Sequence, residues 1–74
     1  LIVSKSFYTY LMTQRNPMSH DEIAQFADNA FLDQTFPKQA TDYDDLSRYL
    51  EENAGYLPNM IIFDETYQQY QETN

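Results

Sequence analysis

The side chains that could bind a metal ion or transfer a proton fall mainly into two acidic segments of this sequence. In the first, the only histidine, His20, is followed directly by Asp21 and Glu22. A transition-metal site needs three or four ligands of the right type, and the chain has no cysteine and no second histidine to complete one. We therefore expect no metal site, and we interpret His20 as an exposed residue in the first turn of a helix.

The second acidic segment resembles the start of a calcium-binding loop, because it contains Asp42, Asp44 and Asp45. Such a loop also needs a glycine at its sixth position and a bidentate glutamate at its twelfth. Counted from Asp42, those two positions hold Ser47 and Asn53. Carboxylates are also favoured in the first turn of a helix, where they face the positive end of the helix dipole. The pattern therefore indicates acids at a helix start.

A hydrolase needs a nucleophile, a base and an orienting group within hydrogen-bond reach of one another. Ser6 and Ser19 are placed to cap helices, and only His20 could act as the usual base. Glu51 and Glu52 are paired carboxylates, but adjacent residues of a helix point in different directions. They also lie near the negative end of a predicted helix, for which the sequence offers no reason. We predict no catalytic and no cofactor-binding residues, and we do not expect an enzyme.

The charge of the chain limits its partners. Twelve carboxylates and four cations in 74 residues give a formal net charge of −8. Non-specific affinity for nucleic acid comes from lysine and arginine that displace counterions, so this balance disfavours a phosphate backbone as the partner. No apolar run approaches the ~20 residues of a membrane span. The absence of cysteine agrees with a cytoplasmic protein, which is the location that we expect.

Helices must position these side chains, because the apolar residues recur at helical spacing. The clearest helix is predicted for residues 20–32, with Ser19 and Glu22 forming a capping box at its start. It ends before Phe36, because the residue that precedes a proline disfavours helical geometry. Its predicted buried face consists of Ile23, Phe26, Ala27, Ala30 and Phe31.

Three further helices are predicted at about residues 6–14, 42–54 and 64–71. Their N-caps are expected to be Ser6, then Thr41 or Asp42, and finally Asp64. Gly55 is well placed as a left-handed residue that ends the third helix, whose inward side holds Tyr43, Leu46, Tyr49 and Leu50. A short turn or fifth helix is expected near 58–62. The fold class is thus an all-α, compact four-helix bundle, with residues 1–74 forming a single small domain.

The five phenylalanines and seven tyrosines are expected to supply the core, because a domain of this size has a narrow margin of stability. The rings could instead stack on bases, as they do in proteins that bind single strands. The residues that we expect to be partly exposed are Tyr10, Tyr49, Tyr56 and Tyr70.

Four strings of the sequence resemble, in the same order, the YozE family of small Gram-positive bacterial proteins. They are SFYTYLMTQR, DEIAQFADNAFLDQTFPK, DYDDLSRYLEEN and YLPNMIIFDETYQQY. The resemblance implies a helical bundle similar to the sterile-alpha-motif (SAM) fold and a bacterial cytoplasmic setting. It implies no activity, and it assigns no catalytic or binding residues. SAM-like folds elsewhere serve protein–protein contacts and sometimes nucleic-acid binding, which is an analogy at the level of fold.

The leading hypothesis is therefore a non-enzymatic interaction module whose partner is another protein. The candidate contact surface consists of Phe36, Pro37, Lys38, Tyr56, Leu57 and Pro58. The alternative for these two segments is that they close the core of the bundle. The alternative function is weak nucleic-acid binding through a local cluster of Lys5, Arg15, Lys38 and Arg48.

Overall fold

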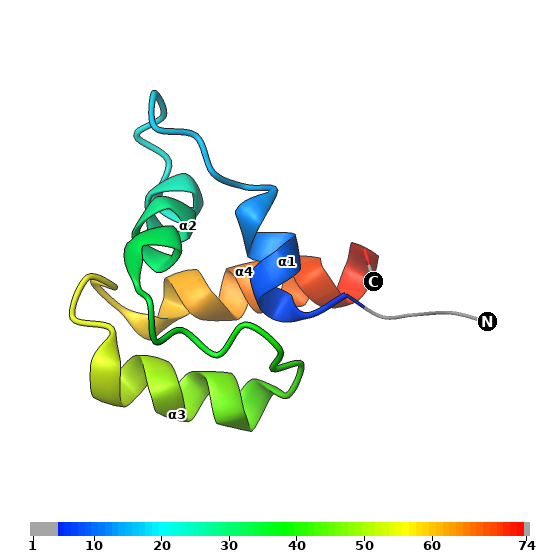
Figure 1. The fold of residues 1–74 in the computed structure, drawn as a ribbon. Helices are drawn as coiled ribbons and strands as arrows, with labels where there is room; N and C mark the ends of the chain where they lie inside the picture. The colour runs from blue at the N-terminus through cyan, green and yellow to red at the C-terminus, as the bar shows by residue number, and fades with distance from the viewer. Residues whose placement is uncertain (1–4, 74) are drawn as a thin grey trace.

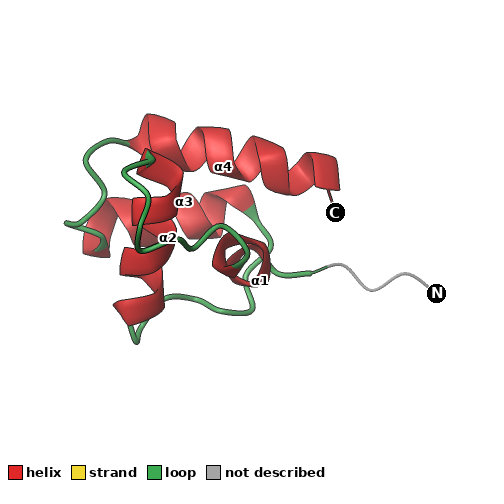
Figure 2. Ribbon diagram, turned by 90° about the horizontal axis from the view of Figure 1, so that it is seen from above, coloured by secondary structure: helices red, strands yellow, loops and turns green. Residues whose placement is uncertain are grey.

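The computed structural model describes residues 5–73, which form four α-helices (Figures 1 and 2). No strand occurs between residues 5 and 73, so the predicted all-α class is confirmed. The ends of the predicted domain, residues 1–4 and 74, lie outside the described part of the chain. The helices are α1 (Phe7–Met12), α2 (Glu22–Leu32), α3 (Tyr43–Asn53) and α4 (Met60–Thr73).

The longest helix, α4, packs against each of the other three. α1 and α2 also pack against each other, and the loop between them extends away from the bundle (Figure 1). α3 lies along α4 and runs in the opposite direction. The molecule therefore has two sides, one formed by α1 and α2 and the other by α3 and α4. The α1–α2 side packs onto the α3–α4 side through contacts with α4.

The predicted N-caps of α1 and α3 are confirmed, but the start predicted for α2 is wrong. Ser6 caps α1, and Asp42 caps α3. The capping residue of α2 is Asp21, whose carboxylate accepts from the backbone N–H groups of Ile23 at 3.1 Å and Ala24 at 3.2 Å. Ser19 instead accepts from the N–H of Asp21 in the preceding turn. A carboxylate at this place satisfies two free N–H groups and also faces the positive end of the dipole, which a serine hydroxyl cannot match.

The expectations for the start of the last helix and the end of the third are also wrong. Asn59 Oδ1 accepts from the backbone N–H groups at 61 and 62, so α4 begins at Met60 rather than at Asp64. The expected turn or fifth helix near 58–62 is therefore largely the first turn of α4. Gly55 has no positive φ, because α3 ends at Asn53 with Ala54 as its C-cap, and the chain then turns through a bond from the Leu57 N–H to the Ala54 carbonyl without a left-handed residue.

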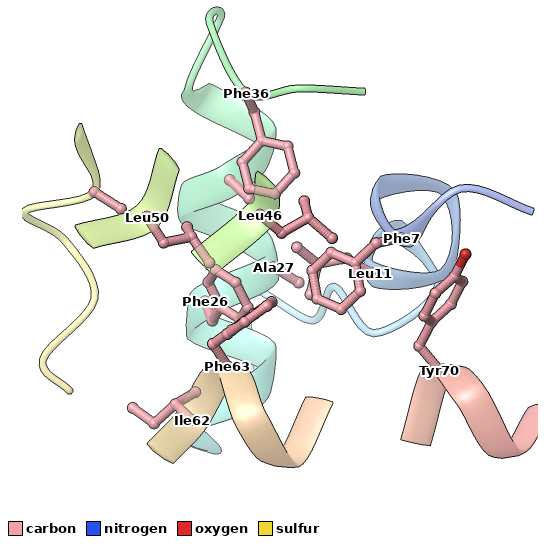
Figure 3. Close-up of a cluster of buried hydrophobic side chains, with 12 residues drawn as sticks. Phe7, Leu11, Phe26, Ala27, Phe36, Leu46, Leu50, Ile62, Phe63 and Tyr70 are labelled. Carbon is pink, nitrogen blue, oxygen red and sulfur yellow. The ribbon is translucent and has the colours of Figure 1, made fainter. Parts of the chain in front are cut away.

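The core is an aromatic cluster centred on Phe7 (Figure 3). The centroid of its ring lies 5.5 Å from those of Phe63 and Tyr70 and 6.3 Å from that of Phe26. Phe36, a residue of the predicted contact surface, folds back onto this core and is buried, which agrees with the alternative given for that segment. Phe7 thus joins α1 to both α2 and α4.

Three aromatic residues lie elsewhere than their spacing predicted. Phe31 is half exposed in the last turn of α2, and the guanidinium of Arg15, from the loop after α1, lies over its ring. Tyr43 is at the first position of α3, and its ring is only partly covered by α4. Tyr70, expected to be partly exposed, is buried, because its hydroxyl donates to the Lys5 carbonyl and so keeps a hydrogen bond inside the protein.

Candidate functional site

Five large apolar side chains are exposed on the described surface. Their exposed fractions are 89% for Met18, 73% for Leu32, 65% for Ile61, 48% for Phe31 and 39% for Tyr43. Scattered apolar residues are ordinary on a protein surface, whereas contiguous ones mark contact sites. Phe31 and Leu32 both lie in the last turn of α2, where their side chains point in different directions, so this end of α2 exposes two of the five and is the first candidate.

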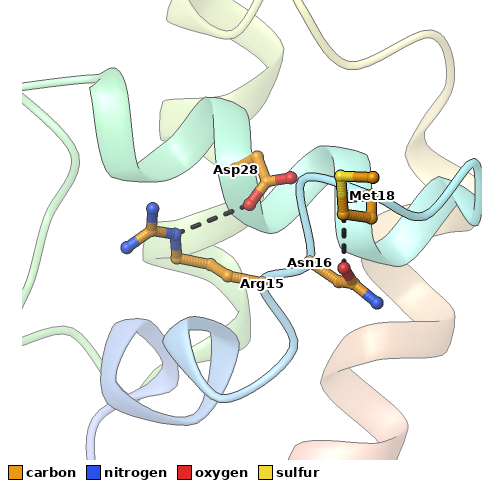
Figure 4. Close-up of polar contacts among 4 residues, drawn as sticks. All are labelled: Arg15, Asn16, Met18 and Asp28. Carbon is orange, nitrogen blue, oxygen red and sulfur yellow. Dashed lines mark hydrogen bonds and ion pairs between the residues drawn. The ribbon is translucent and has the colours of Figure 1, made fainter.

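An arginine lies directly over this end of α2 (Figure 4). The Cζ atom of Arg15 is 3.6 Å from the centroid of the Phe31 ring, a close cation–π contact. The Nε atom of Arg15 is 3.5 Å from Oδ1 of Asp28. That oxygen is buried and has no hydrogen-bond partner among residues 5–73, so Arg15 alone compensates its charge. We call Arg15, Asp28 and Phe31 the Arg15 cluster.

The loop that carries Arg15 is held in a turn by a side chain. Oδ1 of Asn16 accepts from the N–H of Met18 at 3.1 Å, as Figure 4 shows. The side chain of Met18 remains exposed beyond this turn. The loop therefore presents Met18 at the far end of α2 from Leu32.

The remaining cations do not complete a nucleic-acid site. Lys38 lies 5.4 Å from the centroid of the Tyr8 ring and donates to the carbonyl of Gln34. Arg48 on α3 pairs with Asp45 at 3.7 Å. Arg15 and Arg48 are thus each beside a carboxylate. The carboxylate-free face that the nucleic-acid alternative requires is not formed by these two arginines.

Asp33 is the most heavily hydrogen-bonded carboxylate of the described chain. It accepts from the hydroxyls of Tyr49 at 2.6 Å and Tyr56 at 2.8 Å, and from both the N–H and the hydroxyl of Thr35. Burial alone would raise the pKa of this carboxyl, but the four hydrogen bonds outweigh it and lower the pKa below the ordinary value. The pKa of Tyr56 is raised, first by burial and then by its bond to Asp33. Asp33 therefore ties the end of α2 to α3 and to the loop before α4.

The surface predicted from the sequence is only partly accessible. Phe36 is buried, and it closes the core as the alternative reading of that segment held. Pro37, Tyr56 and Leu57 are half-buried. The two residues of the predicted surface that are exposed are Lys38 and Pro58. A contact role for this surface stays a prediction.

A second candidate lies where α3 meets α4. The hydroxyl of Tyr43 donates to Oδ1 of Asp64 at 2.6 Å, and this bond raises the pKa of Tyr43. The Tyr43 ring stacks on Phe63 with 5.2 Å between centroids and meets the Tyr67 ring edge to face at 5.3 Å. Glu51, two turns further along α3, adds a smaller electrostatic contribution that also raises the pKa of Tyr43. We call Tyr43 and Asp64 the Tyr43 pair.

Two small hollows lie on the described surface. One, with about 50 Å³ of space, is lined by Phe26, Tyr56 and Ile62 among others; a second, of about 170 Å³, is lined by Tyr10 and Tyr70 among others. Sites that enclose a small organic ligand usually measure about 300–1,000 Å³.

His20 is exposed, and residues 5–73 contain no group of three or more metal-ligating side chains. None of the helices in this range has both the length and the apolar character that crossing a membrane requires.

The sequence pattern of the YozE SAM-like fold family matches residues 6–72. The chain is 67% identical to a protein of Lactiplantibacillus plantarum over 66 residues, which cover 89% of this chain and 90% of the relative. It is 66% identical to a protein of Ligilactobacillus salivarius over 68 residues, covering 92% and 91% of the two chains. A Latilactobacillus sakei protein is 61% identical over 96% of each chain. All three carry the name UPF0346 protein, which states no activity.

Proposed function

This chain belongs to the YozE SAM-like fold family, and on that premise we propose that it is a non-enzymatic protein–protein interaction module of the bacterial cytoplasm. The observation that carries the proposal is the exposed pair Phe31–Leu32, with Arg15 lying over the Phe31 ring. We call Arg15, Phe31 and Leu32 the interaction patch. Aromatic and arginine side chains dominate the binding energy of protein interfaces, and apolar residues around them exclude water.

The patch is suited to binding because its parts are already held in place. Asp28 fixes the guanidinium of Arg15 over the ring, and the ring itself belongs to a regular helix. A preorganised patch loses little side-chain entropy when a partner binds. Lys38 and Gln34 lie in the loop that follows α2, so they could add polar contacts at its rim.

The same geometry gives an enzyme little support. Asp33 and Tyr56 have shifted pKa values, but Asp33 already accepts from the hydroxyls of both Tyr49 and Tyr56, so this carboxylate is not a free base beside a nucleophile. The two hollows described above are also smaller than sites that enclose a typical small substrate.

Nucleic-acid binding, the alternative function, has weaker support than protein binding. The net charge of −8 repels a phosphate backbone, and two of the four cations are beside carboxylates. No contact within residues 5–73 favours a phosphate track. The proposal therefore commits to a protein partner.

Affinity capture with purified variants tests the proposal. Wild-type protein, Leu32→Ser and Met18→Ser would be immobilised and exposed to lysate from a lactobacillus that carries a relative. Met18→Ser is the matched control, because Met18 is as exposed as Leu32 but lies at the other end of α2. We expect a stoichiometric partner that wild type and Met18→Ser retain equally and that Leu32→Ser loses by about tenfold or more. Absence of any such partner, or equal retention by all three proteins, contradicts the proposal.

A further inference from the structure

We propose that the Tyr43 pair is a docking point for an arginine side chain of a basic protein segment, with Ile61 as the apolar contact beside it. This inference rests on the proposed function, since it names the chemistry of one contact that the interaction module makes. It concerns the α3–α4 side, away from the interaction patch.

The molecule itself shows how such a docking point is occupied. In the Arg15 cluster, a carboxylate and an aromatic ring together hold one guanidinium, which lies 3.6 Å from the ring centroid. The Tyr43 pair offers the same two components, a ring and a carboxylate joined by a 2.6 Å hydrogen bond. The described ion pairs involve Asp28 and Asp45, so Asp64 has no cationic partner within residues 5–73. Phe31 and Asp28 thus already hold the chain's own Arg15, whereas no cation within residues 5–73 pairs with Asp64 beside Tyr43.

The open pair is rigid and accessible. Stacking on Phe63 fixes the plane of the Tyr43 ring, and the hydrogen bond to Asp64 fixes its rotation. Tyr43 nevertheless keeps 39% of its surface exposed. Ile61 precedes Asp64 by one turn of α4 and is 65% exposed, so an apolar contact is available on the same side of that helix. A partner would find these groups already oriented.

The distribution of charge selects a cationic occupant. Residues 1–41 hold three of the four cations and four of the twelve carboxylates, a formal charge of −1; residues 42–74 hold one cation and eight carboxylates, a charge of −7. Among the latter, Asp64 belongs to the Tyr43 pair itself, and its side chain is exposed. A field of this sign steers positively charged segments to the α3–α4 side and repels nucleic acid. Arginine fits better than lysine, because its planar guanidinium can stack on a ring and donate to a carboxylate at once.

Peptide titrations followed by NMR test the inference. The probe is a synthetic peptide with two arginines that flank a leucine, compared with matched peptides in which lysine or uncharged citrulline replaces arginine. We expect saturable shifts at Tyr43, Ile61 and Asp64, an affinity for the arginine peptide about two- to fivefold above that for the lysine peptide, and no binding of the citrulline peptide. Shifts centred on Phe31, or equal affinity for all three peptides, would overturn the inference.

Two matched variants separate a local contact from general charge. Asp64→Asn and Glu22→Gln each remove one negative charge, but Glu22 is on α2. We expect Asp64→Asn to weaken the arginine peptide about threefold or more and Glu22→Gln to leave its affinity within about 1.5-fold. Equal weakening by both overturns the inference. The two tests are independent. If the arginine peptide fails to bind, the inference about the Tyr43 pair fails, but the effect of Leu32→Ser in the lysate capture still stands. If the lysate capture fails, the proposed function fails, but saturable binding of the peptide at Tyr43 still stands.

Discussion

The Arg15 cluster and the Tyr43 pair are built from the same kinds of side chain, yet within residues 5–73 only the first holds a cation. On the α1–α2 side, α1 ends early and the following loop brings Arg15 over α2. On the α3–α4 side, the one cation of α3, Arg48, pairs with Asp45 in its own helix. The difference teaches that a loop can carry a cation across to a carboxylate of another helix, as Arg15 reaches Asp28. On the α3–α4 side, Arg48 stays within its own helix, so the Asp64 carboxylate is left to solvent or a partner.

The two sides are held together by different forces. Ring packing around Phe7 joins them through the core, and the Asp33 carboxylate joins them near the surface. The tyrosines of α4 add bonds to loop carbonyls, such as the hydroxyl of Tyr67 to the carbonyl of Thr41 at 2.8 Å. Substitutions in the core and at the surface link should therefore lower the free energy of unfolding by different amounts.

The largest effect is expected for Phe7→Ala, which removes the ring that both sides share. Deleting a fully buried phenylalanine costs about 3–5 kcal/mol of unfolding free energy, much of the margin of a domain of this size. Urea unfolding followed by circular dichroism measures this loss. Phe31→Ala makes the same chemical change on the half-exposed end of α2 and should cost less than about 1 kcal/mol. Similar costs for both variants would show that the core is not centred on Phe7.

A smaller loss is expected for Asp33→Asn, which weakens the surface link between the sides. Its charged hydrogen bonds to Tyr49 and Tyr56 make a cost of about 1–3 kcal/mol reasonable. Tyr56→Phe removes one of these donors and keeps the ring, so it should cost roughly half as much. An Asp33→Asn protein as stable as wild type would show that the carboxylate does not link the two sides.

The pH dependence of stability gives an independent measure of the same link. The pKa of Asp33 is lower in the folded protein than its ordinary value, so its contribution is fully present above about pH 4 and is lost as the pH falls through the folded pKa. Unfolding free energy measured from pH 6 down to pH 2 should therefore fall more steeply for wild type than for Asp33→Asn. Parallel curves would contradict this assignment.

The next effect concerns the Arg15 cluster alone. Arg15→Gln removes the cation from the Phe31 ring and leaves the buried Oδ1 of Asp28 without compensation, so we expect a loss of about 1 kcal/mol. Arg48→Gln is the control, because its pair with Asp45 is mostly exposed and should contribute less than about 0.3 kcal/mol. Thermal melts at low and high salt distinguish the two. Equal losses would mean that the ring adds nothing to the ion pair.

The sequence predicted the helices and much of the core, because spacing and capping are local properties. The cap Ser6 could be named without coordinates, and the cap of α3 could be narrowed to Thr41 or Asp42. Phe31 and Tyr43 were placed on buried faces wrongly, since spacing shows which residues share a face and not how far a neighbouring helix covers it. That coverage depends on where α1 ends and on how α3 lies along α4.

The candidate sites were harder to predict for the same reason. Leu32 and Ile61 lie off the buried faces of their helices, and this was the available signal for exposed apolar contacts. The pairing of Arg15 with Asp28, and of Tyr43 with Asp64, joins residues 13 and 21 positions apart. Only the packing of the helices brings such pairs together.

The smallest effect on stability is expected when the open pair is given a cation of its own. Ser47 follows Tyr43 by one turn of α3 and lies within 3.5 Å of Glu51, so the side chain of Ser47→Arg can reach both the ring and the carboxylates. The new contacts should raise the melting temperature by about 1–3 °C. The same arginine should compete with the arginine peptide at Tyr43, so the NMR shifts there should diminish. Gln25→Arg adds the same charge to an exposed position of α2 and should leave the peptide contact unchanged. If both variants reduce binding equally, net charge and not the Tyr43 pair governs the interaction, and the two sides differ only in how much charge they carry.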